Sequence, residues 1–286
     1  MASSPSFITP LRYPGGKGRL GLWLAELIKH NGLEDGCYVE PYAGGAGAAV
    51  YLLLNSHIDR IVINDADPVI YAFWWALLND TERLVDLILK TPVNMDTWHE
   101  QQALVTRDCN ADLTATGFAT FFLNRTNRSG IIKGGVIGGK DQSGKYKIDA
   151  RYNVEDLVGR IRKIAKFRDR IKLYGVDAMA LLAMDDVGID NEGLVYLDPP
   201  YYNKGSQLYR NHYKPEDHLE IAKTVLDLKT PWLVTYDNCE EINRIYEGAS
   251  GVEFSIKYST HLARPKAKEI LYYGNLFLNS VPTLKR

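Results

Sequence analysis

The chain has 286 residues, of which 45% are hydrophobic and 24% charged, and its formal net charge is −1. This is the composition of a globular protein with a sizeable core, and no apolar run of about 18 residues indicates a membrane span. Residues 1–9 lack the basic and apolar regions of a signal peptide, and the three cysteines show no metal or disulfide spacing. We therefore expect a cytoplasmic protein, a monomer or weak dimer, without a metal or a membrane partner.

The first 65 residues have the pattern of an α/β unit. Apolar residues recur at helical spacing over 20–29, and residues 36–40 have the character of a short strand. That strand leads into the glycine turn Gly44-Gly45-Ala46-Gly47, from which a helix continues to residue 54. A second strand over 60–64 ends at Asp65. A strand, a glycine turn and a helix in this order are typical of the start of a nucleotide-binding sheet.

The middle of the chain changes character. Apolar spacing predicts a run of helices, and no strand is evident between about residues 75 and 165; the helices are expected over 69–89, 95–107, 116–124 and 154–168. A glycine-rich, basic loop over 131–144 separates the last two helices. We therefore predict an α/β domain formed by residues 1–75 and 166–286, with a helical insertion over 76–165.

This middle region also holds an excess of positive charge. Residues 124–172 contain fourteen Lys or Arg and five Asp or Glu, so they carry +9, whereas the remainder of the chain carries −10. Such asymmetry favours a segment that faces a polyanion on an otherwise acidic body. A solvated helix face with chance clustering of charge is the alternative.

The α/β pattern returns after residue 170. Short apolar runs predict strands over 171–174, 195–197 and 232–236, with a helix over 215–228 between the last two. Residues 253–259 and 269–277 alternate and are rich in aromatic residues, which predicts a final antiparallel pair. The result would be a mixed sheet.

The stretch Asp198-Pro199-Pro200-Tyr201 follows one of these strands directly. Ligands of open α/β sheets bind at the carboxyl ends of the strands. The stretch offers a carboxylate, backbone carbonyls and an aromatic face on a stiff turn, a set that suits a planar ring with an amino group. A proline-stabilised turn with Asp198 as a cap is the structural alternative.

The glycine turn does not match the common phosphate-binding patterns. The dinucleotide fingerprint would need glycine at Val50, and Gly15-Gly16-Lys17-Gly18 lacks the spacing of a P-loop. The acidic residue at the end of the next strand, Asp65, still suits a ribose, because a carboxylate can accept both hydroxyls.

Six segments together resemble the motifs of the Dam-like (D12 class) adenine-specific DNA methyltransferases, in consistent order and over most of the chain. They are Tyr13-Pro14-Gly15-Gly16-Lys17, Glu40-Pro41-Tyr42-Ala43-Gly44-Gly45-Ala46-Gly47, Asn64-Asp65, residues 121–130, Val176-Asp177-Ala178 and Asp198-Pro199-Pro200-Tyr201. The resemblance implies a Rossmann-like fold with helices on both faces of a mixed sheet. It also implies S-adenosylmethionine (SAM) as cofactor, duplex DNA as partner, and a bacterial, phage or prophage setting such as restriction-modification.

The resemblance also implies roles for individual residues. Asp198, Pro199, Pro200 and Tyr201 would be catalytic, with Asp198 and the Pro199 carbonyl accepting the two amino hydrogens of a flipped adenine and Tyr201 stacking on it. Cofactor binding would involve Tyr13, Gly15, Gly16, Lys17, Glu40, Pro41, Tyr42, Ala43, Gly44, Gly45, Gly47, Asp65, Asp177 and Asp198. Asp65 would hold the ribose, and Asp177 would lie near the cofactor's adenine.

DNA binding is expected from the basic segment and from the residue before the first motif. The candidates are Arg12, Asn124, Arg125, Asn127, Arg128, Lys133, Lys140 and Lys145. The cations would contact phosphates, and Asn127 and Arg128 would read bases; Asn124 could instead end a helix. The loop over 130–145 departs from the best-known members, so GATC is only a default for the recognised sequence.

Other functions remain open from the sequence. The same fold could methylate cytosine amino groups, RNA adenine or protein glutamine, although Asp198 favours adenine because the related groups tend to carry Ser or Asn there. A DNA-binding relative without activity would be expected to have a broken motif, and no motif is broken. A nicotinamide dehydrogenase would need the glycine missing at Val50.

Overall fold

A seven-stranded mixed sheet forms the centre of the protein, with strand order β3-β2-β1-β4-β5-β7-β6. The structure is a computed structural model, and it describes residues 8–13, 17–106, 112–185, 187, 192–202, 213–257 and 266–283. The strands are β1 Cys37–Glu40, β2 Arg60–Asn64, β3 Ile171–Tyr174, β4 Leu194–Leu197, β5 Trp232–Asp237, β6 Ser250–Lys257 and β7 Lys266–Gly274. Strands β1 to β5 pair in parallel, and β7 runs antiparallel between β5 and β6, which confirms the predicted mixed sheet.

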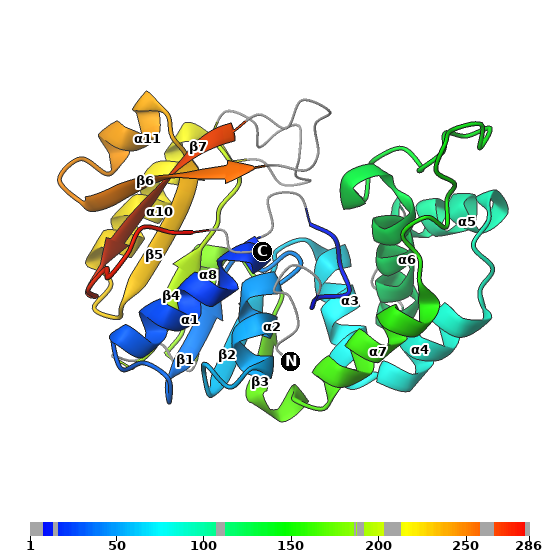
Figure 1. The fold of residues 1–286 in the computed structure, drawn as a ribbon, viewed down its shortest axis with the longest axis horizontal. Helices are drawn as coiled ribbons and strands as arrows, with labels where there is room; N and C mark the ends of the chain where they lie inside the picture. Colours follow the sequence, from blue (N-terminus) through cyan, green and yellow to red (C-terminus); the bar gives the residue numbers. More distant parts are fainter. Residues whose placement is uncertain are drawn as a thin grey trace.

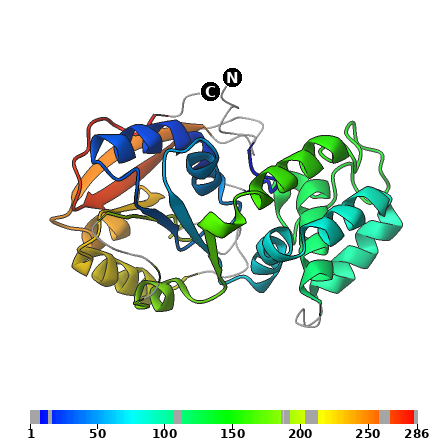
Figure 2. The ribbon, with the colours of Figure 1, turned by 90° about the horizontal axis from the view of Figure 1, so that it is seen from below.

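Helices cover both faces of the sheet, as predicted (Figures 1 and 2). On one face lie α1 (Gly21–His30), α2 (Gly47–Leu54) and α3 (Pro68–Asn79), whose apolar side chains pack with Tyr38, Ile61 and Tyr196. On the other face lie α8 (Ala178–Leu182), α10 (Pro215–Asp227) and α11 (Glu240–Ile245), which pack with Val39, Val62 and Val195. Neighbouring strand residues therefore alternate between the two cores, as the period of a strand requires.

Between β2 and β3 the chain forms the helical layer seen at the right of Figure 1. Its helices are α3, α4 (Thr81–Lys90), α5 (Met95–Thr106), α6 (Leu113–Thr126) and α7 (Val154–Ala165). Helix α6 packs against α3, α4 and α5, and α7 packs against α4. Among the described residues of this region there is no strand beyond an isolated bridge between Asn127 and Val136, so the expectation of helices without strands is confirmed.

Two details of this layer differ from the sequence prediction. The single helix expected over 69–89 is divided at Asp80, whose φ of −137° and ψ of 45° leave the helical range. The Asp80 carboxylate instead accepts a hydrogen bond from the Thr114 hydroxyl, at 2.6 Å, which ties the break to α6. The last helix ends at Ala165, before the short 3₁₀ helix η4 (Arg168–Arg170) leads into β3.

The strand order places a switch point between β1 and β4. From β1 the chain continues outward through β2 and β3, whereas β4 starts on the other side of β1 and continues to β5. Ligands of open α/β sheets bind at such a point, beyond the carboxyl ends of the two strands. Here these ends carry the glycine turn after Glu40 and the stretch that begins at Asp198.

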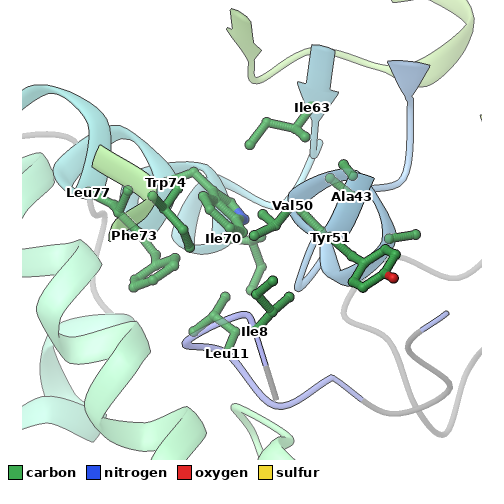
Figure 3. Close-up of a cluster of buried hydrophobic side chains, with 14 of the residues drawn as sticks. Ile8, Leu11, Ala43, Val50, Tyr51, Ile63, Ile70, Phe73, Trp74 and Leu77 are labelled. Carbon is green, nitrogen blue, oxygen red and sulfur yellow. The ribbon is translucent and has the colours of Figure 1, made fainter. Parts of the chain in front are cut away.

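The N-terminal segment covers this edge of the sheet. Ile8 and Leu11 are buried in the same apolar cluster as Val50 of α2 and Trp74 of α3 (Figure 3). The hydroxyl of Thr9 donates to the carbonyl of Gly45, with an oxygen–oxygen distance of 2.6 Å. Residues 8–13 are thereby fixed against the glycine turn, which brings the start of the chain to the switch point.

Candidate active site

The glycine turn after β1 has a shape that requires glycine. Gly44 has a φ of +47°, in the left-handed region, and a Cβ added there would lie 2.7 Å from ring atoms of Tyr13. The carbonyl of Gly44 accepts a hydrogen bond from the buried indole of Trp74 at 2.9 Å. Ala46, also left-handed with a φ of 45°, then starts helix α2. The backbone therefore bends sharply and is held from two sides, as a close approach to a ligand demands.

Asp65 reaches this turn from the end of β2. Its Oδ2 atom accepts the backbone N–H of Gly44 at 2.8 Å, and its Oδ1 atom accepts that of Asp67 at 2.9 Å. Burial raises the pKa of Asp65 to about 7, with the nearby Asp67 adding to the shift and the two backbone hydrogen bonds opposing it. Each carboxylate oxygen keeps a further lone pair, so the group can still accept hydroxyl hydrogens.

Asn64 joins the ends of three segments at this site. Its amide nitrogen donates to the carbonyls of Pro41 and Val176, at 2.9 Å and 3.0 Å, and its amide oxygen accepts the N–H of Val176. Asp177 follows directly and is exposed, with its carboxylate capping α8 through the N–H groups of Met179 and Ala180. Asp65 and Asp177 are thereby brought to the same edge as the glycine turn.

Glu40 lies beneath the turn. Its Oε1 atom accepts hydrogen bonds from the Tyr38 hydroxyl at 2.9 Å and from the N–H of Ala49 in α2 at 3.2 Å. Burial raises the pKa of Glu40 to about 8. The carboxyl group thus links β1 to the first turn of α2 and supports the shape of the glycine turn from inside.

Asp198 stands at the end of β4 with one oxygen anchored. Its Oδ1 atom accepts a hydrogen bond of 2.8 Å from the Thr235 hydroxyl, and the same atom lies 2.8 Å from the Lys17 ammonium. Because Thr235 donates to Asp198, the buried Tyr196 hydroxyl donates to Thr235, at 3.1 Å. Among the described residues, no hydrogen bond or ion pair involves the Oδ2 atom. The Asp198 side chain is 22% exposed, whereas its partner Lys17 is buried.

Lys17 completes the network as a buried cation. Its ammonium is 2.8 Å from Asp198 and 3.4 Å from Oε2 of Glu269, a carboxylate on β7. The Tyr201 hydroxyl donates to Oε1 of Glu269 at 2.7 Å and lies 3.5 Å from the Lys17 ammonium. Burial alone would lower the pKa of Lys17, but the two carboxylates raise it well above its usual value.

Tyr201 occupies a different environment from the one that a stacking platform suggests. Its side chain is buried, its hydroxyl is held by Glu269, and the Lys17 ammonium lies 5.5 Å from the centre of its ring. Pro199 and Pro200 are also buried. Stacking by Tyr201 on a base stays a prediction, and the contacts of the ring point first to a role in holding Lys17.

Three of the residues expected to contact DNA lie inside the protein. Asn124 bonds the backbone N–H and carbonyl of Arg12 and the carbonyl of Gly130, and Asn127 accepts from the Trp98 indole and donates to two carbonyls. Arg125 donates to the carbonyls of Pro10 and Arg151, and burial followed by repulsion from Arg12 lowers its pKa to about 9. This differs from the expectation of exposed contacts, because these polar groups are used to fasten the N-terminal segment and the basic loop to α6.

The remaining basic candidates are accessible. Arg128, Lys133, Lys140 and Lys145 are exposed, and Arg12 is half-buried. The loop that carries the lysines is ordered by Gln142, whose amide nitrogen donates to the carbonyls of Ile137 and Gly139 and whose oxygen accepts the N–H of Ile148. Arg128 and the loop line a hollow of about 470 Å³. Gly130, at the start of this loop, packs closely against Arg12, and the next residue, Tyr13, packs its ring against Gly44. The N-terminal segment therefore connects the loop to the glycine turn.

Two of the residues expected to bind the cofactor, Gly15 and Gly16, lie outside the described residues. Conversely, the structure adds Glu269 and Thr235 to the site, which the sequence motifs did not predict. The sequence did contain an indication of both. Glu269 is two residues from buried Leu271 and Thr235 is two residues from buried Leu233, so each lies on the buried face of its strand. A polar side chain on a buried face needs a hydrogen-bond or charge partner.

The described parts of the chain contain no group of His, Cys, Asp and Glu suited to a metal ion. None of their helices is both long enough and apolar enough to cross a membrane.

Comparison with known proteins identifies the family. The family model of the D12 class N6 adenine-specific DNA methyltransferases matches residues 13–262. The curated relative type II methyltransferase M.MjaIII of Methanocaldococcus jannaschii is 23% identical over 285 residues, covering 92% of this chain and 96% of the relative.

Solved structures show more distant similarity. A Listeria monocytogenes protein described as a putative class I S-adenosylmethionine-dependent methyltransferase has 10% identity and a TM-score of 0.40, and the match covers 93% of this chain and 62% of that one. The Legionella pneumophila protein LPL1258 has 12% identity and a TM-score of 0.32, over 96% of this chain and 86% of that one.

The strand order and the acidic, glycine-lined switch point are those of an open α/β sheet, in which ligands bind beyond the carboxyl ends of the strands. Because the family model spans most of the sequence, the chain belongs to the D12 class N6 adenine-specific DNA methyltransferases. It is an enzyme that methylates adenine in DNA, with S-adenosylmethionine as methyl donor.

Proposed function

We propose that the enzyme methylates the exocyclic amino group of an adenine that has left the duplex, and that Asp198 receives this amino group. The observation that carries the proposal is the state of the Asp198 carboxylate. One oxygen is anchored by Thr235 and Lys17 at 2.8 Å each, on a side chain that is 22% exposed at the switch point. An accessible and oriented acceptor is what the amino group of a base needs.

The chemical difficulty lies in the amino nitrogen, whose lone pair is delocalised into the ring. S-adenosylmethionine supplies an activated methyl group, whose bond to sulfur breaks with its electron pair as the bond to nitrogen forms. Asp198 would accept one amino hydrogen and the Pro199 carbonyl the other, which directs the nitrogen lone pair at the methyl carbon. The positive charge that forms on the nitrogen disappears when a proton passes to water. Asp198 acts as an acceptor and as a negative charge, so no covalent intermediate with the enzyme is required.

The glycine turn and its neighbours fit the cofactor. A Cβ at Gly44 would collide with Tyr13, and the carboxylate of Asp65 already organises the backbone of the turn while retaining acceptor capacity. We assign the ribose hydroxyls to Asp65 and the adenine end to the neighbourhood of Asp177, which Asn64 brings to the same edge. Tyr13 and Lys17 border the methionine end or the base pocket.

Cofactor binding should depend on pH through Asp65. Ionised Asp65 accepts hydroxyl hydrogens well, and its pKa is about 7, so the ionised fraction rises about tenfold between pH 6 and pH 8. Affinity for S-adenosylmethionine, measured by calorimetry across this range, is expected to rise by about that factor and then level off. Asp65→Asn should bind weakly with no such slope. A slope that persists in Asp65→Asn would show that another group titrates.

The helical insertion over 76–165 is proposed as the target-recognition part. Its exposed cations include Arg128 and Lys145, which line the hollow of the basic loop, and Lys133 and Lys140, which belong to the same loop. Burial is the main cause that lowers the pKa of Arg12 and Arg125, and repulsion from neighbouring arginines adds to it. DNA phosphates would relieve that repulsion. Arg128, whose side chain is exposed, is the remaining candidate for base reading; the Asn127 side chain is used in the protein interior.

Salt dependence tests this surface. Removing a single cation–phosphate pair should reduce the slope of log affinity against log salt concentration by about 0.9. Lys145→Ala is expected to lower that slope and to weaken binding similarly for all sequences, as measured by fluorescence anisotropy on duplex DNA. The control is Lys229→Ala, an exposed lysine at the amino end of β5, on the opposite edge of the sheet. Equal slopes for Lys145→Ala and the unmodified protein would remove Lys145 from the interface.

The choice of nucleic acid can be tested with one labelled cofactor. Tritiated methyl transfer should be fastest to duplex plasmid DNA, slower to heat-denatured DNA and absent with RNA of the same sequence. Sequencing the modified plasmid gives the recognised motif, and 2-aminopurine placed at the target adenine should then gain fluorescence when the enzyme binds. Preferential labelling of RNA would overturn duplex DNA as the substrate. Binding without a change in fluorescence would overturn the proposal that the base leaves the duplex.

A further inference from the structure

Glu269 is a carboxylate where the packing favours an apolar side chain. It lies within β7, is 1% exposed, and alternates in phase with the buried Leu271. Burying a carboxylate carries a large desolvation penalty unless charge and hydrogen bonds offset it. Burial does raise the pKa of Glu269, and the Lys17 ammonium opposes that shift. Methyl transfer through Asp198 and Pro199 alone leaves Glu269 without a task.

The contacts of Glu269 lead to the reacting carboxylate by two routes. One oxygen accepts the Tyr201 hydroxyl at 2.7 Å, and Tyr201 belongs to the turn that begins at Asp198. The other oxygen is 3.4 Å from the Lys17 ammonium, which is itself 2.8 Å from Asp198. Asp198, Glu269 and the Tyr201 hydroxyl surround the ammonium, and the contact with Oε2 of Glu269 is an ion pair without a hydrogen bond.

The charge of this group matters for the reaction. If Lys17 paired with Asp198 alone, the two would sum to zero, and the positive charge forming on the amino nitrogen would meet a neutral site. With Glu269 as a second counter-ion the three groups sum to −1, and the ammonium is shared. Fixed negative charge in a site that excludes water lowers the energy of a cationic transition state.

We propose that Glu269 is a positioning residue for methyl transfer: it holds Lys17 and Tyr201, and so keeps Asp198 oriented and the charge of the site at −1. Glu269 does not touch the substrate; it acts through its two neighbours. The proposal rests on the proposed function of Asp198 as the acceptor of the amino group. It predicts that Glu269 affects the chemical step and leaves the binding of both substrates almost unchanged.

Glu269→Gln separates charge from shape, because the amide oxygen still accepts from Tyr201. We expect kcat on duplex DNA to fall by about 10- to 100-fold, less than for a group that touches the reacting atoms. The KM values for DNA and for S-adenosylmethionine should stay within about threefold. Because burial raises the pKa of Glu269, we expect kcat of the unmodified protein to decline toward acid pH as Glu269 takes up a proton, and this part of the decline should be absent from Glu269→Gln. The control is Glu253→Gln on the neighbouring strand β6, an exposed carboxylate that pairs with Lys268 and should leave every parameter unchanged.

Glu269→Asp keeps the charge and shortens the side chain, so its kcat should exceed that of Glu269→Gln by about fivefold or more. If the glutamine variant does not fold, the aspartate variant decides alone. The proposal is supported if its kcat stays within about tenfold of the unmodified value and still declines at acid pH. A larger loss of kcat, or a kcat that does not decline at acid pH, overturns the proposal. Unchanged kcat in Glu269→Gln, or equal losses in both variants, would overturn it too. An inactive unmodified protein would instead contradict the proposed function, so the two failures are distinguishable.

Discussion

Asp198→Ala is expected to abolish methyl transfer while DNA binding persists. The substitution removes the acceptor of the amino hydrogen and the negative charge beside it, so kcat should fall by about 10³ or more. The fold should survive, because the Asp198 side chain is 22% exposed and Lys17 retains Glu269 as a counter-ion. Tritiated methyl transfer gives kcat, and anisotropy with labelled duplex gives DNA affinity.

The matched control for this experiment is Asp169→Asn, since the Asp169 side chain is 94% exposed in η4 and far along the sheet from β4. It should leave transfer and binding unchanged. Retained activity in Asp198→Ala would remove Asp198 from the chemistry. Joint loss of activity, cofactor binding and DNA binding would mean that Asp198 serves the fold.

Lys17→Met is expected to produce a large loss of stability. The substitution keeps the length of the side chain but leaves Glu269, 1% exposed, without its cation. Removing one partner of a buried ion pair costs about 3 kcal/mol in the free energy of unfolding, which urea denaturation measures directly. Because the pKa of Lys17 is raised, its stabilising effect is present below about 10.5 and declines only as the pH rises through the higher folded value.

Two further measurements identify the cause of that loss of stability. In Lys17→Met the deficit should shrink as the pH falls, because Glu269, whose pKa is already raised by burial, then becomes neutral. The double variant Lys17→Met with Glu269→Gln should recover most of the stability, since it leaves no unpaired charge at position 269. A double variant as unstable as Lys17→Met would show that packing, and not charge, causes the loss.

The local motifs were predictable because they are contiguous in the sequence. Gly44 follows the first predicted strand, Asp65 follows the second, and Asp198 follows a later one. Because the carboxyl ends of parallel strands meet at one edge of the sheet, this was enough to predict that the three residues lie close together. The mixed sheet and the helical layer were likewise predicted from the spacing of apolar residues along the sequence. The break at Asp80 did not, because it depends on a hydrogen bond to Thr114 from a distant helix.

The partners of the site residues were beyond local reasoning. Glu269 reaches Lys17 from the far end of the sequence only because β7 inserts beside β5, and that strand order has no local signal. Asn124, Arg125 and Asn127 are polar residues in a basic stretch, so the sequence favours a DNA contact for them. Only the packing of the N-terminal segment on α6 reveals that their hydrogen bonds are used inside.

The chain belongs to the N6 adenine-specific DNA methyltransferases, and our central proposal is that this site places the methyl group on the amino nitrogen of adenine in duplex DNA. The sharpest experiment is to incubate the purified protein with S-adenosylmethionine and unmethylated plasmid, digest the DNA to nucleosides, and identify the methylated base by mass spectrometry. We expect N6-methyladenine with the unmodified protein and none with Asp198→Ala. Methylcytosine without N6-methyladenine, or no methylated nucleoside despite cofactor and DNA binding, would contradict this proposal.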